Sequence, residues 1–396
     1  MASSIGLSDL VLWMVILHFH GNGLAGGRSI AMEEYFQMET YTKFLNRPAI
    51  KSIETTNGDI FECVDIYKQP AFDHPRLKNH TIQMRPSTYL GGTKNEVSAV
   101  KVQNIEQKNG GCPLGTVPIH RARITDILMK GSIPKFGKND GDRFLHHYAT
   151  MELKEVQSIY GTAAGLNVWK PKVQNHSQLS ISQIWVTAGP DNELNTIEAG
   201  WMVYPNLNGD DEPRLFVYWT ADGYKHGCYN LLCKGYVQVS PNVAPGFAIH
   251  PISTYNGTQY AIYLSIVKDM KTGNWLLLWG EDQSKLIGYW PKELFNYLED
   301  KAEVVMWGGE TYGTNSYPEM GSGHFPEEGA GRACFISKIR VFDYNRIQRN
   351  VDPAETLTHY DVPHCYRSIV DRSIDHQTYM YFGGPGGNCV TPSYPN

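Results

Sequence analysis

The fold depends on Asn195-Thr-Ile-Glu-Ala-Gly-Trp-Met-Val-Tyr204, a run whose large apolar residues recur at alternate positions. Side chains of a β-strand alternate between its two faces, so this run predicts a strand with one core-facing side. That side would carry Ile197, Ala199, Trp201 and Val203, and the other would carry Glu198, Gly200, Met202 and Tyr204. The run therefore predicts a core strand that presents a carboxylate on its outer face.

A second run, Ala302-Glu-Val-Val-Met-Trp-Gly-Gly-Glu310, repeats the arrangement and places Glu310 opposite a core-facing row. A single Glu in a strand is usually a solvated surface residue, because Glu is rarely buried without a partner. Here both glutamates stand among Gly, Met, Trp and Tyr instead of Lys, Thr and Ser. Glycine in a strand leaves room for another backbone to lie close. The composition is suited to the floor of a cleft.

Similar short runs recur between Gly, Pro, Asn and Asp turns along the second half of the chain. The 396 residues include 38 Gly and 22 Pro, a composition that favours strands and turns over helices. The predicted strands are 183–187, 196–204, 214–220, 235–239, 259–267, 274–280, 286–290, 302–309 and 332–342. We therefore expect a mostly β fold, an antiparallel sandwich of two packed sheets.

The N-terminal third of the chain has a different pattern. Apolar residues at helical spacing predict a helix over 29–46, and prolines with short strand signals follow it. A stretch rich in Gly and Lys at 130–140 is predicted to be an exposed linker. We expect a small α+β prosegment over 28–140 and the sandwich over 141–396, in which only residues 291–298 resemble a helix.

Features of the first 27 residues predict export. Residues 10–19 are an apolar run followed by small residues, too short to span a bilayer and typical of a signal peptide over 1–27. Three glycosylation sequons agree with this interpretation, at Asn79, Asn175 and Asn256. The expected location is secreted, either extracellular, apoplastic or vacuolar, and no later segment predicts a membrane span.

The charge is unevenly distributed. Residues 28–140 carry 16 basic and 12 acidic residues, a net +4, whereas residues 141–396 carry 19 and 27, a net −8. Opposite charges suggest that the first unit docks on the second. The acidic sandwich has no basic stripe, which argues against a nucleic-acid partner.

Seven cysteines in an exported chain predict three disulfides and one free thiol. Cys228 and Cys233 would close a short loop, Cys365 and Cys389 would bracket a Gly-rich segment, and Cys63 would pair with Cys112 in the prosegment. Cys334 lies in a strand-like run and is expected to be buried and reduced. The spacing and the exported context suit a structural disulfide at Cys228 and Cys233 better than zinc.

Five short motifs in the second half of the chain resemble the plant neprosin family of glutamic peptidases. They are Glu198-Ala-Gly-Trp201, Gly227-Cys-Tyr-Asn-Leu-Leu-Cys233, Gly288-Tyr-Trp-Pro291, Trp307-Gly-Gly-Glu310 and Met320-Gly-Ser-Gly-His-Phe-Pro-Glu-Glu-Gly329. The segments that begin at Cys63 and Cys112 resemble the activation peptide that precedes the catalytic domain in that family. Cys334 departs from the family, which does not usually place a cysteine there.

The resemblance implies a zymogen in which Glu198 and Glu310 activate a water molecule, with no metal or cofactor. Two facing carboxyl groups tend to share a proton, so one can act as base and the other as acid, in an order that the sequence does not decide. The resemblance also implies cleavage of proline-containing peptides and proteins on the carboxyl side of proline. The proline ring would stack on an aromatic residue such as Tyr218, Trp219, Tyr289 or Trp290.

Other chemistries fit the residues less well. The chain contains no Gly-x-Ser-x-Gly, no His-Glu-x-x-His and no phosphate-binding loop. His324 could act as a base, although its Gly-rich surroundings favour a packing role. The main alternative is a glycoside hydrolase, which also uses two carboxylates in an aromatic cleft, or a lectin-like β-sandwich that binds carbohydrate without cleaving it.

Overall fold

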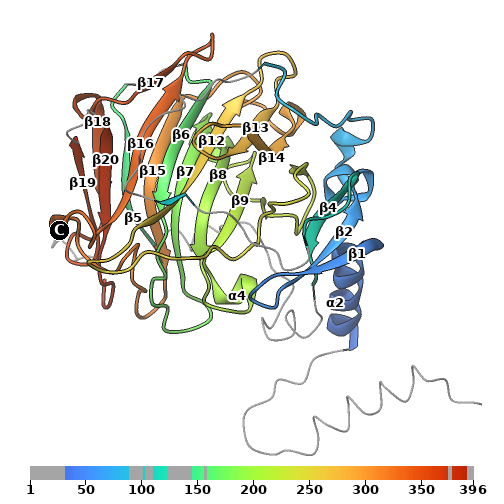
Figure 1. The fold of residues 1–396 in the computed structure, drawn as a ribbon, viewed down its shortest axis with the longest axis horizontal. Helices are drawn as coiled ribbons and strands as arrows, with labels where there is room; N and C mark the ends of the chain where they lie inside the picture. Colours follow the sequence, from blue (N-terminus) through green and yellow to red (C-terminus); the bar gives the residue numbers. More distant parts are fainter. Residues whose placement is uncertain are drawn as a thin grey trace, which may run out of the picture.

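The computed structural model describes residues 32–88, 101–102, 110–122, 145–155, 158–372 and 377–389. Two sheets pack face to face, antiparallel except where β3 (Lys101–Val102) pairs with β12 (Tyr260–Lys268), and a small α+β unit lies beside them (Figure 1). The mostly β sandwich with a small N-terminal α+β unit is therefore confirmed. The predicted signal peptide over 1–27, the linker over 130–140 and the boundary after residue 140 lie outside the described residues.

The first sheet has seven strands in the order β10-β9-β8-β7-β15-β5-β18. The two glutamate-bearing runs form β8 and β15, which lie on either side of β7. The strands are β10 (Gly227–Tyr229), β9 (Arg214–Thr220), β8 (Asn195–Val203), β7 (Leu179–Ala188), β15 (Val304–Tyr312), β5 (His146–Leu153) and β18 (Thr356–Tyr360). All described neighbours in this sheet are antiparallel.

The second sheet has ten strands, eight of which follow the order β11-β14-β13-β12-β6-β16-β20-β19. The other two strands pair at its margins, β17 with β16 and β3 with β12. The bounds are β11 (Val237–Gln238), β14 (Lys285–Trp290), β13 (Trp275–Trp279), β12 (Tyr260–Lys268), β6 (Gly161–Asn167), β16 (Cys334–Phe342), β20 (Thr378–Gly383), β19 (Arg367–Arg372), β17 (Gln348–Asn350) and β3 (Lys101–Val102). Each strand predicted from the sequence overlaps an observed strand.

Two tryptophans fasten the glutamate strands to the opposite sheet. Trp201 in β8 and Trp307 in β15 are fully buried between the sheets. The indole N–H of Trp201 donates to the carbonyl oxygen of Asn167 at 3.0 Å, and that of Trp307 donates to the Thr162 hydroxyl at 3.1 Å. Both acceptors lie in β6, so a single strand of the second sheet fixes the positions of both glutamate strands.

β6 was not among the predicted strands. Its sequence, Gly-Thr-Ala-Ala-Gly-Leu-Asn, lacks the β-branched and aromatic residues that usually indicate a strand. The small residues are required by packing, because a Cβ at Gly165 would lie 2.5 Å from the ring of Tyr263 on β12. β5, β18, β19 and β20 were also not predicted.

The predicted helix over 291–298 is wrong. The structure forms only a 3-10 turn there, over Lys292–Leu294. The amide N–H groups of Asn296, Tyr297 and Leu298 instead donate to the side-chain oxygen of Asn195, at 3.0, 2.9 and 3.3 Å. A side chain 101 to 103 residues away in sequence thus takes the hydrogen bonds that a helix would have used.

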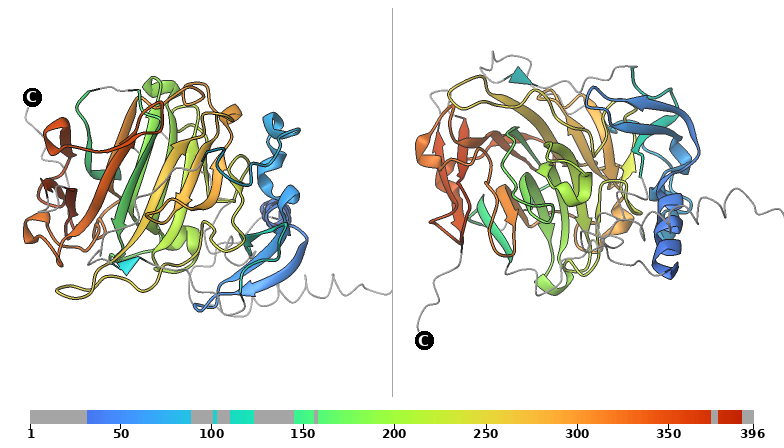
Figure 2. Two further views of the ribbon diagram at one scale, coloured as in Figure 1. Left: turned by 45° about the horizontal axis from the view of Figure 1, so that its top comes forward. Right: turned by 90° about the horizontal axis from the view of Figure 1, so that it is seen from below.

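The N-terminal unit lies at one side of the sandwich, opposite β18 to β20 (Figures 1 and 2). It consists of helix α2 (Met32–Leu45), which confirms the predicted helix, a sheet in the order β1-β2-β4, and 3-10 turns. The bounds of its strands are β1 (Ala49–Glu54), β2 (Ile60–Asp65) and β4 (Thr116–His120). Its apolar side chains Ile66, Ala71, Ile82 and Val117 form one buried cluster with the outer face of the ten-stranded sheet.

The structure contains the three predicted disulfides, Cys63–Cys112, Cys228–Cys233 and Cys365–Cys389. Cys334 is free and buried, as predicted, and its burial raises the pKa of the thiol. The sequon residues Asn79, Asn175 and Asn256 are all exposed, so each is accessible to a glycan.

Candidate active site

Strand register places the two glutamates on one outer face of the seven-stranded sheet. Glu198 pairs with Trp185 of β7, and Glu310 pairs with Ile181 of the same strand. Gln183 lies midway between these positions, paired with Gly200 on one side and Gly308 on the other. Glu198 and Glu310 therefore each lie diagonally across from Gln183, on the two strands that flank β7. Each glutamate has its α-carbon roughly 7 to 8 Å from that of Gln183.

The glycines beside the glutamates allow the strands to approach closely. A Cβ at Gly200 would lie 2.0 Å from the carbonyl oxygen of Ser182, and one at Gly308 would lie 2.3 Å from that of Ala149. Gly308 also has a φ of 151°, which L side chains rarely adopt. The prediction that these glycines make room for a neighbouring backbone is confirmed.

Glu310 is almost completely buried and is hydrogen-bonded from two neighbouring strands. Its Oε1 lies 2.5 Å from Nδ1 of His146 and 3.4 Å from the hydroxyl of Tyr148, both on β5. Its Oε2 accepts a hydrogen bond from Nε2 of Gln183 at 3.0 Å. The Oε1 atom of Gln183 is buried and has no hydrogen-bond partner among the described residues. An amide thus links Glu310 to the middle of the site and keeps one acceptor available there.

Glu198 is also buried, and its described hydrogen bonds come from hydroxyl groups. Its Oε1 accepts from Tyr224 at 2.8 Å and from Thr196 at 3.0 Å. Tyr224 follows β9 in a tight turn and has a φ of 65°, a left-handed conformation that is costly for a residue with a side chain. The turn brings its ring back over Tyr218, with the two ring planes only 19° apart. The strained turn therefore aims a phenol at Glu198.

Aromatic and aliphatic side chains surround Glu198 on the same face. Tyr218 lies directly opposite Glu198 in the adjacent strand, and its ring contacts Tyr229 at a centroid distance of 4.6 Å. This apolar cluster comprises Leu179, Ile181, Met202, Phe216 and Tyr218, with Tyr204, Leu207, Tyr224, Tyr229 and Tyr312 at its edge. The site thus combines two carboxyl groups with an extended apolar floor.

Of the four predicted substrate-binding aromatics, only Tyr218 shares this face. Trp219 points to the inner side of β9 and lies edge-on to Phe295. Tyr289 lies on the outer face of the other sheet, and Trp290 is buried in the core against Tyr236. The structure therefore places Trp219, Tyr289 and Trp290 away from the face that carries Glu198 and Glu310. Adjacent residues of a strand face opposite sides, so a Tyr-Trp pair can offer at most one ring to a face.

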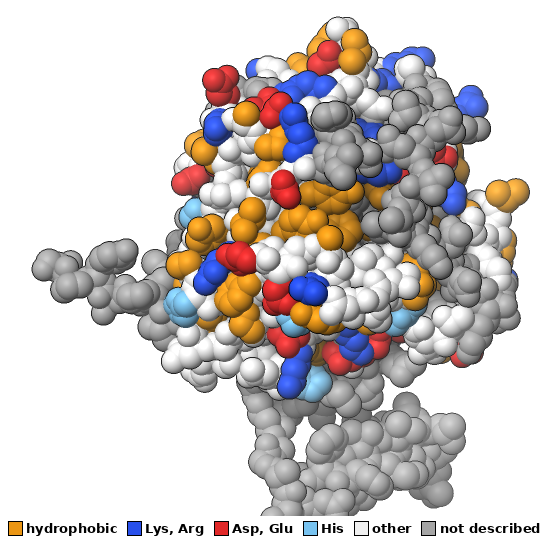
Figure 3. All heavy atoms as spheres, turned by 60° about the vertical axis from the view of Figure 1, so that its left-hand side comes forward, with side chains coloured by type: hydrophobic (Ala, Val, Ile, Leu, Met, Phe, Trp, Pro, Cys, Tyr) orange, Lys and Arg blue, Asp and Glu red, His pale blue; other side chains and the backbone are white. Residues whose placement is uncertain are grey.

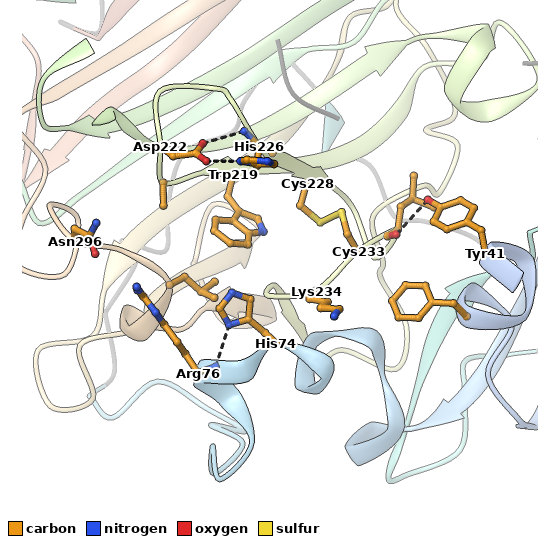
Figure 4. A pocket seen from close by; sticks show the side chains of 15 residues that line it. Tyr41, His74, Arg76, Trp219, Asp222, His226, Cys228, Cys233, Lys234 and Asn296 are labelled. Atoms are coloured by element: carbon orange, nitrogen blue, oxygen red, sulfur yellow. Dashed lines mark hydrogen bonds and ion pairs between the residues drawn. A yellow bond between two sulfur atoms is a disulfide. The ribbon is translucent and has the colours of Figure 1, made fainter. Parts of the chain in front are cut away.

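Trp219 instead faces the N-terminal unit across a cavity of about 670 Å³. Figure 4 shows its indole above His74 and Arg76 of the N-terminal unit, with the Cys228–Cys233 disulfide beside it. The rings of Trp219 and His74 are 6.2 Å apart. Burial, together with the nearby charges of Arg76 and Lys234, lowers the pKa of His74.

Polar contacts hold the N-terminal unit on the sandwich. Asp59 accepts two hydrogen bonds from the buried guanidinium of Arg214, at 2.7 and 3.0 Å. Nε2 of His80 lies 2.8 Å from the Tyr289 hydroxyl, and burial lowers the pKa of His80, opposed by the charge of Glu293. In this bidentate ion pair the negative group, Asp59, is on the N-terminal unit and the positive group, Arg214, is on the sandwich. The net charges of the two units, +4 and −8, suggested the opposite arrangement.

Charged side chains of both signs are mixed on one face of the described surface. Figure 3 shows basic and acidic side chains interspersed on the face that it brings forward, with apolar side chains between them. Among the described residues, no group of three or more His, Cys, Asp or Glu side chains is placed to hold a metal ion. No helix in the described part of the chain is long and apolar enough to cross a membrane.

Three residues of the site were not identified from the sequence, namely Gln183, His146 and Tyr224. Gln183 lies within a predicted strand, on the face that carries neither Ile184 nor Val186 of the core. The only sequence feature that could have identified Gln183 was a polar amide on the outer face of a buried strand. Nothing in the sequence connects His146 or Tyr224 to a particular glutamate, because strand order determines both contacts.

Replacing Tyr224 with Phe removes the hydroxyl that contacts Glu198 and keeps the ring. A typical hydrogen bond contributes about 0.5 to 1.5 kcal/mol, so we expect catalytic efficiency to fall roughly 2- to 10-fold, with a loss of stability of no more than about 1.5 kcal/mol. Tyr255→Phe is the matched control, because the Tyr255 hydroxyl contacts Glu328 at the same 2.8 Å outside the site. Equal activities of the two variants would contradict a role for Tyr224.

Two protein-family models together match most of the chain. A family model described as Neprosin matches residues 176–385, and one described as Neprosin activation peptide matches residues 52–163. The second range includes β5 and nearly half of β6, so the activation-peptide model extends past the structural start of the sandwich.

Two solved structures align with the chain at low identity. The crystal structure of Scytalido-glutamic peptidase with a peptide-based transition-state analogue covers 60% of this chain and 97% of its own, with 9% identity and a TM-score of 0.30. The Ruminococcus gnavus IT-sialidase CBM40 bound to α2,6-sialyllactose covers 40% and 77%, with 11% identity and a TM-score of 0.20. At these TM-scores neither alignment bears on the function.

Proposed function

The chain belongs to the neprosin family, and from this premise we propose that it is a secreted glutamic endopeptidase that cleaves on the carboxyl side of proline at acid pH. Family membership and the activation peptide make it a peptidase that is produced as a zymogen. The proline preference, the catalytic roles of the glutamates and the secreted location are the proposed part. The observation that supports it most is the pair of buried glutamates on one sheet face, on opposite diagonals of Gln183.

In this proposal the substrate carbonyl lies above Gln183, between Glu198 and Glu310. One carboxylate removes a proton from a water molecule as the water attacks the carbonyl carbon, and the other, protonated, donates its proton to the oxyanion. As the C–N bond breaks, the first group passes the proton taken from water to the leaving nitrogen, and the second group recovers its proton from the diol. Carboxyl groups thus carry out every proton transfer in this scheme. Gln183 keeps the two groups apart, and its amide oxygen offers an acceptor for a substrate N–H or the attacking water.

The proline ring would lie on the apolar floor next to Glu198. Tyr218 is held there by Tyr224 and Tyr229, so its ring is fixed before a substrate binds. A rigid aromatic surface favours proline because the pyrrolidine ring is flat, apolar and loses little conformational entropy on binding. Peptides with Ala or Gly in place of proline would make less contact with this surface.

The proposal is tested by supplying a proline-containing peptide and a β-glucan to the activated protein at acid pH. Mass spectrometry of the peptide should show a new C-terminal proline, and the glucan should be neither cut nor bound. Cleavage after residues other than proline would contradict the specificity but keep the peptidase. Cleavage or binding of the glucan alone would return the glycoside hydrolase and lectin alternatives.

A further inference from the structure

His146 is the first residue of β5 and contacts Glu310 from the adjacent strand. Only 7% of the residue is exposed, and its Nδ1 lies 2.5 Å from Oε1 of Glu310. Its ring packs against Tyr312, with the two centroids 4.9 Å apart, and lies nearly parallel to that of Tyr148 at 6.4 Å. Two tyrosines thus hold the imidazole in place against the carboxylate.

We propose that His146 is a positioning residue that keeps Glu310 ionised at acid pH, which makes Glu310 the general base and Glu198 the proton donor. This inference rests on the proposed function, because it assigns roles within the proposed pair. It extends that function by adding a third ionisable group, which touches Glu310 and not the reacting atoms.

The argument begins with the charge of the imidazole. Histidine is protonated below its ordinary pKa of about 6.5, so at acid pH a cation would lie in contact with Glu310. A cation within hydrogen-bonding distance favours the ionised form of a carboxyl group, typically by about 1 to 3 pH units. Burial leaves the pair little screened by solvent, while the cost of desolvating both charges opposes part of this effect.

The described hydrogen bonds of Glu198 differ from those of Glu310 in the charge of the donors. They come from the hydroxyls of Tyr224 and Thr196, which are neutral at acid pH. A hydroxyl can donate to an ionised carboxylate or remain bonded to a protonated carboxyl group. It therefore favours the ionised form of Glu198 less strongly than an imidazolium would. Two carboxyl groups in unlike environments separate into an acid and a base.

The other groups that face Glu310 agree with this assignment. β5 contributes His146 and Tyr148, β15 itself contributes Tyr312, and β7 contributes the neutral amide of Gln183. From β8, the charge of Glu198 would oppose ionisation of Glu310 only when Glu198 is itself ionised. His359 of β18 is on the same face, paired with Thr150, but is exposed and one strand farther away. Among the described residues, His146 is thus the cation in contact with Glu310.

The test compares the pH dependence of kcat/KM in the activated wild type, His146→Gln and His147→Gln. Loss of the cation should move the acid limb of the His146→Gln profile upward by about 1 to 2 pH units. His147 is the matched control, because it faces the inner side and contacts Asp361. Its variant should keep the wild-type acid limb. An unchanged acid limb in folded His146→Gln would overturn the proposal.

If His146→Gln does not fold, a second measurement tests the interaction between His146 and Glu310. The ring signals of His146 are followed by NMR through a pH titration in the wild type and in Glu310→Gln. The titration midpoint of His146 should fall by at least about 1 pH unit when Glu310 loses its charge, because the interaction is reciprocal. Equal midpoints in the two proteins would overturn the proposal.

The same variants separate this inference from the proposed function. If Glu310→Gln keeps normal turnover, Glu310 is not catalytic and the proposed function fails. If Glu310→Gln is inactive while the acid limb of His146→Gln stays in place, the glutamate pair stands and only the role of His146 is lost.

Discussion

Replacing either Glu198 or Glu310 with Gln is expected to reduce turnover of a proline-containing peptide by at least about 10²- to 10⁴-fold. Gln preserves the shape and most of the hydrogen bonding of Glu but cannot exchange the proton. Because both carboxyl groups act on the same water and carbonyl, the double variant should be little worse than either single variant. Steady-state rates at acid pH, measured on activated protein, provide the comparison.

Glu327→Gln is the control for these variants. Glu327 is exposed and paired with Arg367 at 2.9 Å in a loop outside the sheet face, so its variant should retain most of the activity. Circular dichroism and melting curves should show that all four proteins are folded. Near-normal turnover in folded Glu310→Gln would remove the pair from the mechanism and bring the carbohydrate-binding alternatives forward.

Acidification is expected to release the N-terminal unit once the linker has been cut, and histidines should cause the release. The docked pKa values of His74 and His80 are lowered, mainly by burial, so the docked state binds fewer protons than the free state. Docking is therefore strongest above about pH 6.5 and weakens as the pH falls below that value, by up to about tenfold per histidine per pH unit.

The carboxylates of the interface respond to acid at a lower pH than these histidines do. Desolvation would raise the pKa of Asp59, but its bonds to His120 and Arg214 outweigh this and lower it. The backbone and side chain of Ser87 help to lower the pKa of Asp269 against a similar desolvation cost. Both groups stabilise docking above their ordinary pKa and lose that contribution only at still lower pH. Mild acid thus acts on the histidines first.

The measurement uses full-length protein with a specific protease site inserted in residues 130–140. After cleavage at neutral pH, size-exclusion chromatography between pH 7 and 4 should show the N-terminal fragment bound at pH 7 and separated at pH 5. His74→Gln/His80→Gln should keep the fragment bound at pH 5. His324→Gln, which alters a histidine bonded to Glu328 outside the interface, should behave as the wild type. Identical release curves for all three proteins would contradict this mechanism.

Local sequence patterns predicted much of the architecture. Alternation was sufficient to place Glu198 and Glu310 opposite the core, and helical spacing was sufficient for α2, because both patterns follow from the geometry of a single element. The same reasoning could not choose among Tyr218, Trp219, Tyr289 and Trp290. That choice depends on which sheet each strand joins, and strand order involves residues far apart in the chain.

The contacts of the glutamates show this limit most clearly. Gln183 lies between them only because β7 separates β8 from β15, although β7 and β8 are adjacent in sequence and β15 follows about 100 residues later. His146 reaches Glu310 across 164 positions of sequence. The sequence shows Glu-x-Gly-Trp at 198–201 and the reverse, Trp-Gly-x-Glu, at 307–310. The structure gives the reason: Gly200 and Gly308 both pair with Gln183, which places the two glutamates on either side of it.

The position of β5 limits how far maturation can proceed. This strand follows the linker segment in the chain, pairs with β15 and β18 on its two sides, and carries the partner of Glu310 at its first residue. An exopeptidase that trims a cut linker would meet a strand paired on both sides at His146. Catalytic chains whose N-termini differ but all precede residue 145 should therefore have one folded core and one specific activity. A preparation could have ragged N-termini and still contain a homogeneous enzyme.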